Sequence, residues 1–107
     1  MTIRVLAKST VLEARRVSSD GERDRTLHAH PRWAQGFQLG GPSRAPRPMG
    51  RNGSALAFGH NGSSTCNSWV DPDRGLVFVY LTNIAAPRVA ALHHMSDVSD
   101  ALLNAML

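Results

Sequence analysis

The sequence has few of the residues that form covalent or metal cross-links. Only one of its 107 residues is a cysteine, Cys66, which excludes an internal disulfide and a cysteine cluster for zinc. The five histidines include no His-x-x-x-His pair, and no carboxylate lies at ligand spacing from them. They are His28, His30, His60, His93 and His94. We therefore expect no metal site and no cofactor.

Long apolar runs are also absent. No run approaches the roughly 20 residues that cross a bilayer, and the first eight residues hold no apolar segment of signal-peptide length. As written, the sequence predicts a cytoplasmic protein without a membrane span. Apolar residues make up 42% and charged residues 19%, which is ordinary globular composition, and the length allows one domain.

Lysine is almost missing, because Lys8 is the one lysine beside eleven arginines. The net charge is +4, and it is uneven. Residues 1–53 hold ten basic and four acidic groups, and residues 54–107 hold two basic and four acidic groups. Arginines cluster at 15–25 and 44–51, but acidic residues alternate with the first cluster and no aromatic residue is interleaved to stack a base. We expect a solvated face and no nucleic-acid partner, with an arginine-mediated nucleic-acid binder as the competing hypothesis.

A matched nucleophile and base cannot be found in the sequence. The lone lysine excludes Ser-x-x-Lys, because residue 5 is Val5. No Gly-x-Ser-x-Gly elbow or phosphate-binding glycine loop is present. Cys66 lies in an apolar, β-rich stretch, where a cysteine is usually an inert core residue.

The first half of the sequence contains few patterns that predict regular secondary structure. Thr10 and Glu13 have capping-box spacing, which predicts a short helix from Thr10 to about Ser18. A polar loop should follow over 18–25. Residues 33–39 alternate as one strand interrupted at Gly36. Residues 40–53 contain too many glycines and prolines for a helix or a central strand, and predict a long irregular loop.

The second half predicts an antiparallel meander and a helix. Strands are expected at 54–60, 65–71 and 76–82, with a turn at 71–75. The apolar run 76–81 predicts a buried central strand. Pro87 suits the first turn of a helix, whose apolar stripe comprises Val89, Leu92, Met95, Val98, Leu102 and Ala105.

The order of elements predicts an α+β fold, an antiparallel sheet with a long C-terminal helix packed on one face. Within one domain of residues 1–107, residues 1–32 would form a helix and a polar loop. Residues 33–83 would form the strands around the irregular loop 40–53, and residues 87–106 the helix.

One ordered set of residues in the second half is distinctive. It comprises Phe58-Gly59-His60-Asn61-Gly62, small residues, Asp-Pro at 71–72, Gly-Leu at 75–76, an apolar run, and Thr-Asn at 82–83. Gly-Phe-Gln-Leu-Gly at 36–40 precedes it. The set resembles the C-terminal signature of the beta-lactamase-related serine hydrolases, which include class C beta-lactamases, D-alanyl-D-alanine peptidases and esterases. The likeness covers most of the chain, and implies an incomplete domain of the beta-lactamase and transpeptidase type.

The resemblance assigns roles to the residues after the Phe-Gly pair. His60 would line the pocket and help to set its proton network, Gly62 would let substrate approach the strand, and the Ser63 amide would be one donor of an oxyanion hole. These three are the expected catalytic residues, and Asn61 and Ser64 are the expected substrate contacts. Family members often have glycine where Ser64 stands, which makes the pocket edge bulkier here.

The other two motifs of the family, Ser-x-x-Lys and Tyr-x-Asn, are absent from the sequence. The chain is therefore interpreted as the C-terminal fragment of a serine hydrolase that cleaves a small ester or amide through an acyl-serine, and that is inactive alone. The alternative is a non-catalytic binding or assembly module, with a separately encoded N-terminal half or a second copy as its partner.

Overall fold

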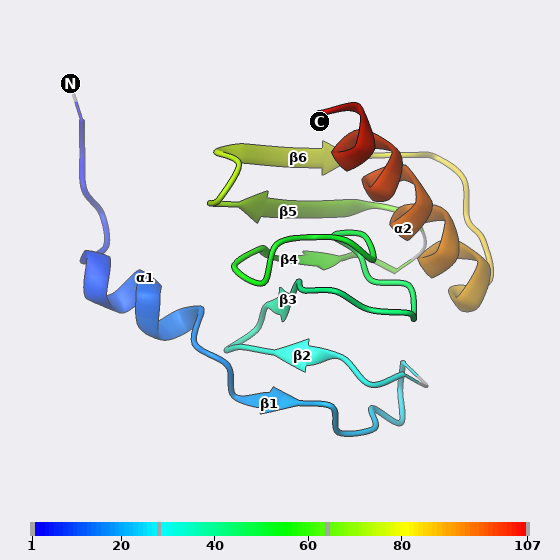
Figure 1. Ribbon diagram of the computed structural model, residues 1–107, viewed down its shortest axis with the longest axis horizontal. Helices are drawn as coiled ribbons and strands as arrows, with labels where there is room; N and C mark the ends of the chain where they lie inside the picture. Colours follow the sequence, from blue (N-terminus) through cyan, green and yellow to red (C-terminus); the bar gives the residue numbers. More distant parts are fainter. Residues whose placement is uncertain (1, 28, 64, 107) are drawn as a thin grey trace.

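The computed structural model describes residues 2–27, 29–63 and 65–106. The fold is α+β: a six-stranded antiparallel sheet in the order β1-β2-β3-β4-β5-β6, with a long C-terminal helix across one face (Figure 1). The elements are α1 (Lys8–Ala14), β1 (Ser19–Asp20), β2 (Arg32–Trp33), β3 (Gln38–Leu39), β4 (Phe58–Asn61), β5 (Asn67–Asp71), β6 (Leu76–Tyr80) and α2 (Arg88–Ala105). In the described part of the chain, no helix is both long and apolar enough to cross a membrane.

The meander β4-β5-β6 forms the regular part of the sheet. Trp69 in β5 pairs with Gly59 in β4 and with Phe78 in β6, so the three residues share the face that α2 covers. The turn between β5 and β6 forms at the predicted place. Gly75 there has a φ of 61°, and the buried Asp71 carboxylate accepts a hydrogen bond from the Arg74 guanidinium at 2.6 Å.

The core lies between this face and α2, and an irregular loop fills it. Met49, from the predicted loop 40–53, is fully buried together with Ala57, Trp69 and Leu103. The loop thus contributes to the core in the way that a strand or a helix usually does.

Hydrogen bonds join the same loop to the sheet on one side and to α2 on the other. The Pro48 carbonyl accepts hydrogen bonds from Asn67 Nδ2 and from Ser99 Oγ, both at 2.6 Å. Ser99 Oγ in turn accepts one from the Trp69 indole N–H at 3.0 Å. Sheet, loop and helix are therefore joined through one buried carbonyl, which satisfies the polar groups that the loop brings into the core.

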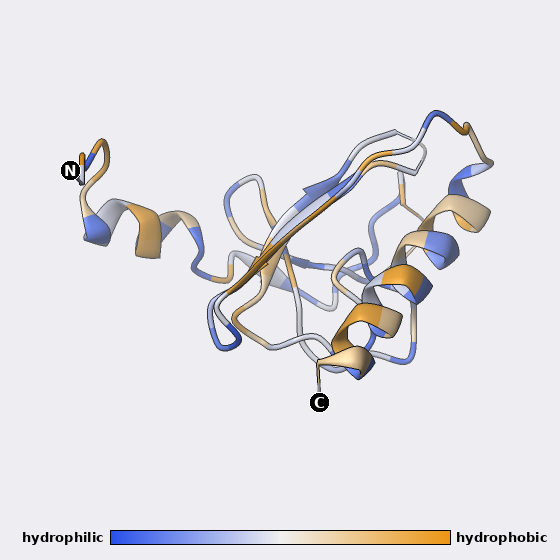
Figure 2. Ribbon diagram, turned by 90° about the horizontal axis from the view of Figure 1, so that it is seen from above, coloured by the Kyte–Doolittle hydropathy of each residue, from blue (hydrophilic) through white to orange (hydrophobic). Residues whose placement is uncertain are grey.

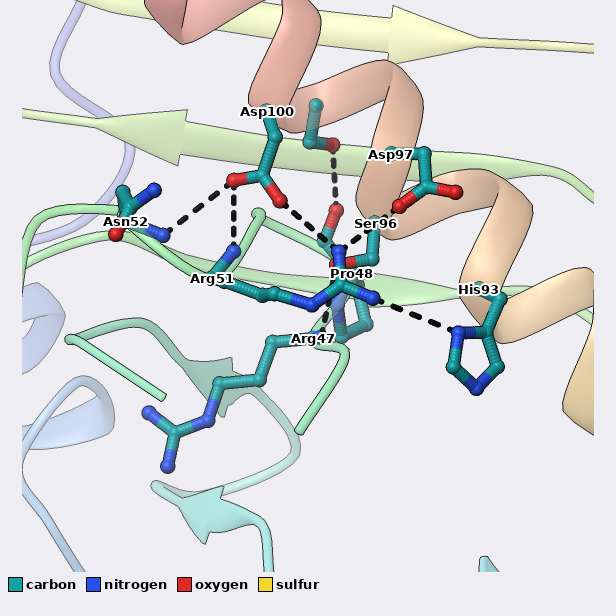
Figure 3. Close-up of polar contacts among 9 residues, drawn as sticks. Arg47, Pro48, Arg51, Asn52, His93, Ser96, Asp97 and Asp100 are labelled. Atoms are coloured by element: carbon teal, nitrogen blue, oxygen red, sulfur yellow. Dashed lines mark hydrogen bonds and ion pairs between the residues drawn. The ribbon is translucent and has the colours of Figure 1, made fainter. Parts of the chain in front are cut away.

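A second group of polar contacts between the loop and α2 lies nearer the surface (Figure 3). Arg51 is ion-paired with Asp97 at 2.8 Å and with Asp100 at 3.2 Å. The Asp100 carboxylate also accepts the Arg51 backbone N–H at 2.8 Å. The hydrogen bond to Asp97 contributes most to raising the pKa of Arg51, burial opposes it, and Asp100 adds to it. This cluster joins loop 40–53 to α2 through Asp97 and Asp100.

Three expectations for the first half differ from the structure. The single strand at 33–39 is two strands, β2 and β3, which pair with each other as a hairpin. Gly36 has a φ of 79°, a left-handed value that turns the chain where an interruption was expected. The helix α1 begins at Lys8 rather than at Thr10, and no side chain caps it. Within the expected polar loop 18–25, residues 19–20 form β1.

Three expectations for the second half also need correction. The expected strands at 54–60, 65–71 and 76–82 are shorter, and β6 lies at the edge of the sheet, not at its centre. Val77 and Val79 are 69% and 58% exposed, because only the face toward α2 is covered. On α2 the buried face comprises Ala91, Met95, Ser96, Ser99 and Leu103. It is rotated from the expected stripe because the two serines bond to loop 40–53.

Candidate functional site

The residues His60 to Ser63 lie where β4 ends, in the interior of the strand order rather than at its edge. They open into a cavity of about 520 Å³. Its other walls come from the segment before β2, from loop 40–53 and from the start of α2. The four residues that the sequence placed in one motif are therefore on one wall of one cavity. Ser64 lies outside the described residues.

His60 is exposed, and its ring has a defined orientation. Its Nδ1 is 2.5 Å from the Asn61 carbonyl oxygen, which can only accept, so Nδ1 carries the hydrogen and Nε2 of the neutral ring is an acceptor. The ring also stands against Trp33, with centroids 5.7 Å apart. Nε2 has no hydrogen-bond partner among the described residues, and is therefore available to a ligand.

Asn61 is tied to its neighbours. Its Oδ1 accepts a hydrogen bond from Gln38 Nε2 at 2.8 Å, and its Nδ2 donates to the Gly62 carbonyl at 3.3 Å. The Gly62 N–H donates to the Cys66 carbonyl at 2.9 Å. These bonds close the turn after β4 and fix the direction in which the next amide points.

The Ser63 amide differs from the Gly62 amide. Ser63 is exposed, and its backbone N–H has no acceptor among the described residues. A backbone donor of a residue that lines a cavity, held by a closed turn and without an acceptor among the described residues, is available to an oxygen atom of a ligand.

The two glycines of the motif have different physical explanations. A Cβ at Gly59 would lie 2.2 Å from the Ser68 carbonyl oxygen and 2.5 Å from Trp69 Cα, so the packing of β4 on β5 requires glycine. A Cβ at Gly62 would meet nothing closer than Cys66 Cβ at 3.6 Å, and Gly62 has no left-handed φ. Neither packing nor backbone conformation within the described residues requires glycine at position 62.

Charged groups elsewhere on the cavity wall are not part of the motif. The Asp24 carboxylate accepts the Leu27 N–H and the Thr26 N–H, both at 2.8 Å. The Leu27 N–H does most to lower the pKa of Asp24; burial opposes this, and Thr26, Trp33 and Arg88 add to it. These interactions favour the charged form of the Asp24 carboxyl group on this wall.

Arg47 is the other charged group that sequence reasoning did not assign to the site. Its Nη1 donates to the Gly40 and Gly41 carbonyls at 3.1 and 3.2 Å. Burial lowers the pKa of Arg47, Arg32 lowers it further, and Asp20 raises it. No local motif marks Arg47, because its place on the cavity depends on the path of an irregular loop. Within residues 2–27, 29–63 and 65–106, no three potential metal ligands gather.

Comparisons with known proteins bear on the family and the fold of the chain. A family model described as Beta-lactamase matches residues 2–101. The structure is similar to the crystal structure of a beta-lactamase from Mycobacterium bovis, with a TM-score of 0.73, 28% sequence identity and 94% of this chain covered. This chain spans 38% of the length of that protein. No curated protein sequence matched.

Proposed function

Because the chain belongs to the beta-lactamase family, we propose that it is the C-terminal part of a serine hydrolase that cleaves an ester or amide through an acyl-serine. The observation that carries the proposal is the Ser63 backbone N–H, which lies at the wall of the cavity without an acceptor among the described residues. In this proposal the chain supplies the backbone N–H that stabilises the developing negative charge, and the attacking serine comes from outside it.

The chemistry needs such a donor. When an ester or amide carbonyl is attacked, its oxygen gains negative charge, and a fixed N–H directed at that oxygen stabilises the transition state by about 3 kcal/mol. The closed turn at Asn61 and Gly62 holds the Ser63 amide in place before substrate arrives. Glycine at position 62 leaves room for an acyl group to pass close to the backbone.

His60 is proposed to set the proton network beside that donor. Its Nε2 accepts a hydrogen bond or a proton, since Nδ1 is committed to the Asn61 carbonyl. Trp33 restricts the ring on one side. Among the described residues no side-chain hydroxyl is hydrogen-bonded to His60, so its proposed role depends on a nucleophile brought next to it. Asn61, and Ser64 beyond it, are proposed to contact the substrate.

The chain by itself is proposed to be inactive, because the sequence contains neither Ser-x-x-Lys nor Tyr-x-Asn. Purified protein should hydrolyse a chromogenic short-chain ester and a chromogenic cephalosporin at the background rate. Serine-dependent turnover well above background would overturn the proposed inactivity.

The donor itself can be tested by amide NMR with 4-acetamidobenzamide, a neutral compound that carries an acyl group. We expect it to shift the Ser63 amide resonance. Ser63→Ala keeps the backbone N–H and should preserve binding, whereas Ser63→Pro removes it and should weaken binding by about tenfold or more. Equal binding by the two variants would contradict an oxyanion-type role for this amide.

Exposed apolar surface favours a second candidate, the assembly module. The edge strand β6 presents Val77 and Val79, and the N-terminal segment presents Ile3, Val5 and Leu6. Charged side chains, proline or a bulge usually blunt such an edge, whereas β6 has no charged residue or proline and pairs with β5 in a continuous register. Size-exclusion chromatography with a hydrophobic dye tests this candidate, because a monomer that binds no dye would contradict it.

A further inference from the structure

Two successive peptide groups follow β4, and three of their four polar groups are bonded. The Asn61 carbonyl accepts the hydrogen of His60 Nδ1 at 2.5 Å, and the Gly62 N–H donates to the Cys66 carbonyl at 2.9 Å. The Gly62 carbonyl accepts a hydrogen bond from Asn61 Nδ2 at 3.3 Å. The fourth group, the Ser63 N–H, has no acceptor among the described residues. The direction of this N–H therefore depends on what holds the Gly62 carbonyl.

The Gly62 carbonyl and the Ser63 N–H belong to one planar peptide group, so they point in opposite directions and rotate together. Glycine gives the backbone unusual freedom of rotation. Packing does not restrict it here, because a Cβ at Gly62 would meet nothing closer than Cys66 Cβ at 3.6 Å. The Asn61 amide group, which donates to the Gly62 carbonyl, thus opposes rotation of the peptide group that carries the Ser63 N–H.

Gln38 fixes which end of the Asn61 amide group faces the Gly62 carbonyl. Gln38 is only 5% exposed, begins β3, and donates from Nε2 to Asn61 Oδ1 at 2.8 Å. An amide nitrogen donates and does not accept, so Gln38 keeps Oδ1 on its own side and leaves Nδ2 toward Gly62. If the Asn61 amide group were turned over, two oxygen atoms would face each other at Gly62 and two NH₂ groups would face each other at Gln38.

We propose that Gln38 is a positioning residue for the Ser63 N–H, on which it acts through the Asn61 amide group. The inference rests on the proposed function, because it treats that N–H as the donor to the acyl oxygen of the ligand. Gln38 pairs with Gly59 of β4 in the sheet, so a buried residue of the sheet sets the direction of a donor in the exposed turn. A donor that is held before the ligand arrives needs no reorganisation when the ligand binds.

The first test compares Gln38→Glu with the wild-type chain by amide NMR. The substitution keeps the size of the side chain but replaces the donor with an acceptor at neutral pH, so it favours the turned-over Asn61 amide group. Without ligand, the order parameter of the Ser63 amide should fall. The affinity for 4-acetamidobenzamide should fall about fivefold. Ser99→Ala removes buried hydrogen bonds at a residue that does not line the cavity, and should change neither measurement.

Gln38 also lines the cavity, so a second test separates positioning from direct contact with the ligand. In the Asn61→Ala background the link to Gly62 is missing. Gln38→Glu should there leave the Ser63 order parameter unchanged and the affinity within about twofold. If thermal unfolding shows that Gln38→Glu is unfolded, Gln38→Met removes the donor without adding a charge, and should lower the Ser63 order parameter in the same direction.

The outcomes distinguish this inference from the proposed function. If Gln38→Glu leaves the Ser63 order parameter and the affinity at their wild-type values, or acts equally with and without the Asn61 amide group, the role of Gln38 is wrong and the proposed donor is not affected. If 4-acetamidobenzamide does not shift the wild-type Ser63 resonance, the proposed donor is wrong. A fall in the order parameter would then still support Gln38 as the residue that orients the turn, and an unchanged value would contradict both proposals.

Discussion

Two segments without strands, loop 40–53 and the N-terminal segment 2–14, differ in how they relate to the rest of the fold. The loop has no regular secondary structure, yet Met49 within it is fully buried and its Pro48 carbonyl joins the sheet to α2. The N-terminal segment contains the helix α1, yet none of the residues of that helix is buried. Figure 2 shows this segment extending away from the sheet while α2 lies across its face.

The comparison shows that regular structure and structural importance are separate properties in this chain. A helix of seven residues gains little stability alone, because its first turn is costly and it has no packed face. An irregular loop can be central if its polar groups find partners, as Pro48 and Arg51 do. Stability should therefore depend on the loop and hardly at all on the N-terminal helix.

The largest effect is expected at Met49. Met49→Ala removes a fully buried side chain from the cluster with Trp69 and Leu103 and leaves a cavity, so the free energy of unfolding should fall by about 2–5 kcal/mol. Met106→Ala, at an exposed position, should change it by less than about 0.5 kcal/mol. Urea denaturation followed by tryptophan fluorescence measures both. Equal effects would contradict the central place given to the loop.

An intermediate effect is expected at Ser99. Ser99→Ala deprives the buried Trp69 N–H of its acceptor and the Pro48 carbonyl of one donor, which should cost about 1–3 kcal/mol. If the unpaired indole causes the loss, Trp69→Phe should cost less in the Ser99→Ala background than in the wild type. Additive effects in this double-mutant cycle would show that the two groups are not coupled.

A smaller effect is expected at Asp100. Its carboxylate accepts a backbone N–H and the guanidinium of Arg51, so Asp100→Asn should cost about 1–2 kcal/mol. Asp97→Asn breaks a more exposed ion pair with the same arginine, and should cost less than about 1 kcal/mol. Denaturation at low and high salt measures both, and the Asp97→Asn effect should shrink with salt. A larger loss of stability for Asp97→Asn than for Asp100→Asn would contradict the greater contribution expected from Asp100.

Sequence reasoning found the fold class and the meander because their signals are local. The Asp71–Gly75 turn and the apolar run after it predict a hairpin wherever it lies in the sheet. The position of β6 in the strand order is a tertiary property, and an apolar run cannot distinguish a central strand from an edge strand whose second side is unpaired. The hairpin at Gly36 depends on the left-handed φ of that residue. An alternating pattern with one glycine in it does not distinguish such a turn from one interrupted strand.

The candidate site was predictable only in part. The resemblance to a family pointed to the residues His60 to Ser63. They lie on the same wall of the cavity because they are consecutive in the chain. Asp24 and Arg47 reach the cavity from separate irregular segments and Trp33 reaches it from β2, so no spacing in the sequence brings them together. Ser96 and Ser99 are buried on α2 because they bond to loop 40–53. Their partners lie about 50 residues away in the sequence, so the pattern of apolar residues in the helix did not indicate that they are buried.

The smallest effect on stability is expected in the N-terminal segment. Ile3 and Val5 are 72% and 87% exposed, so the double substitution Ile3→Ser and Val5→Ser should change the free energy of unfolding by less than about 0.5 kcal/mol. The same variant should bind less hydrophobic dye and elute later in size-exclusion chromatography if these side chains contribute to assembly. A matched variant, Val77→Thr and Val79→Thr, keeps the β-branched shape on β6 and tests the other exposed surface. If the serine variant is destabilised by more than about 1 kcal/mol, the N-terminal segment packs against the body in solution, and the contrast with loop 40–53 does not hold.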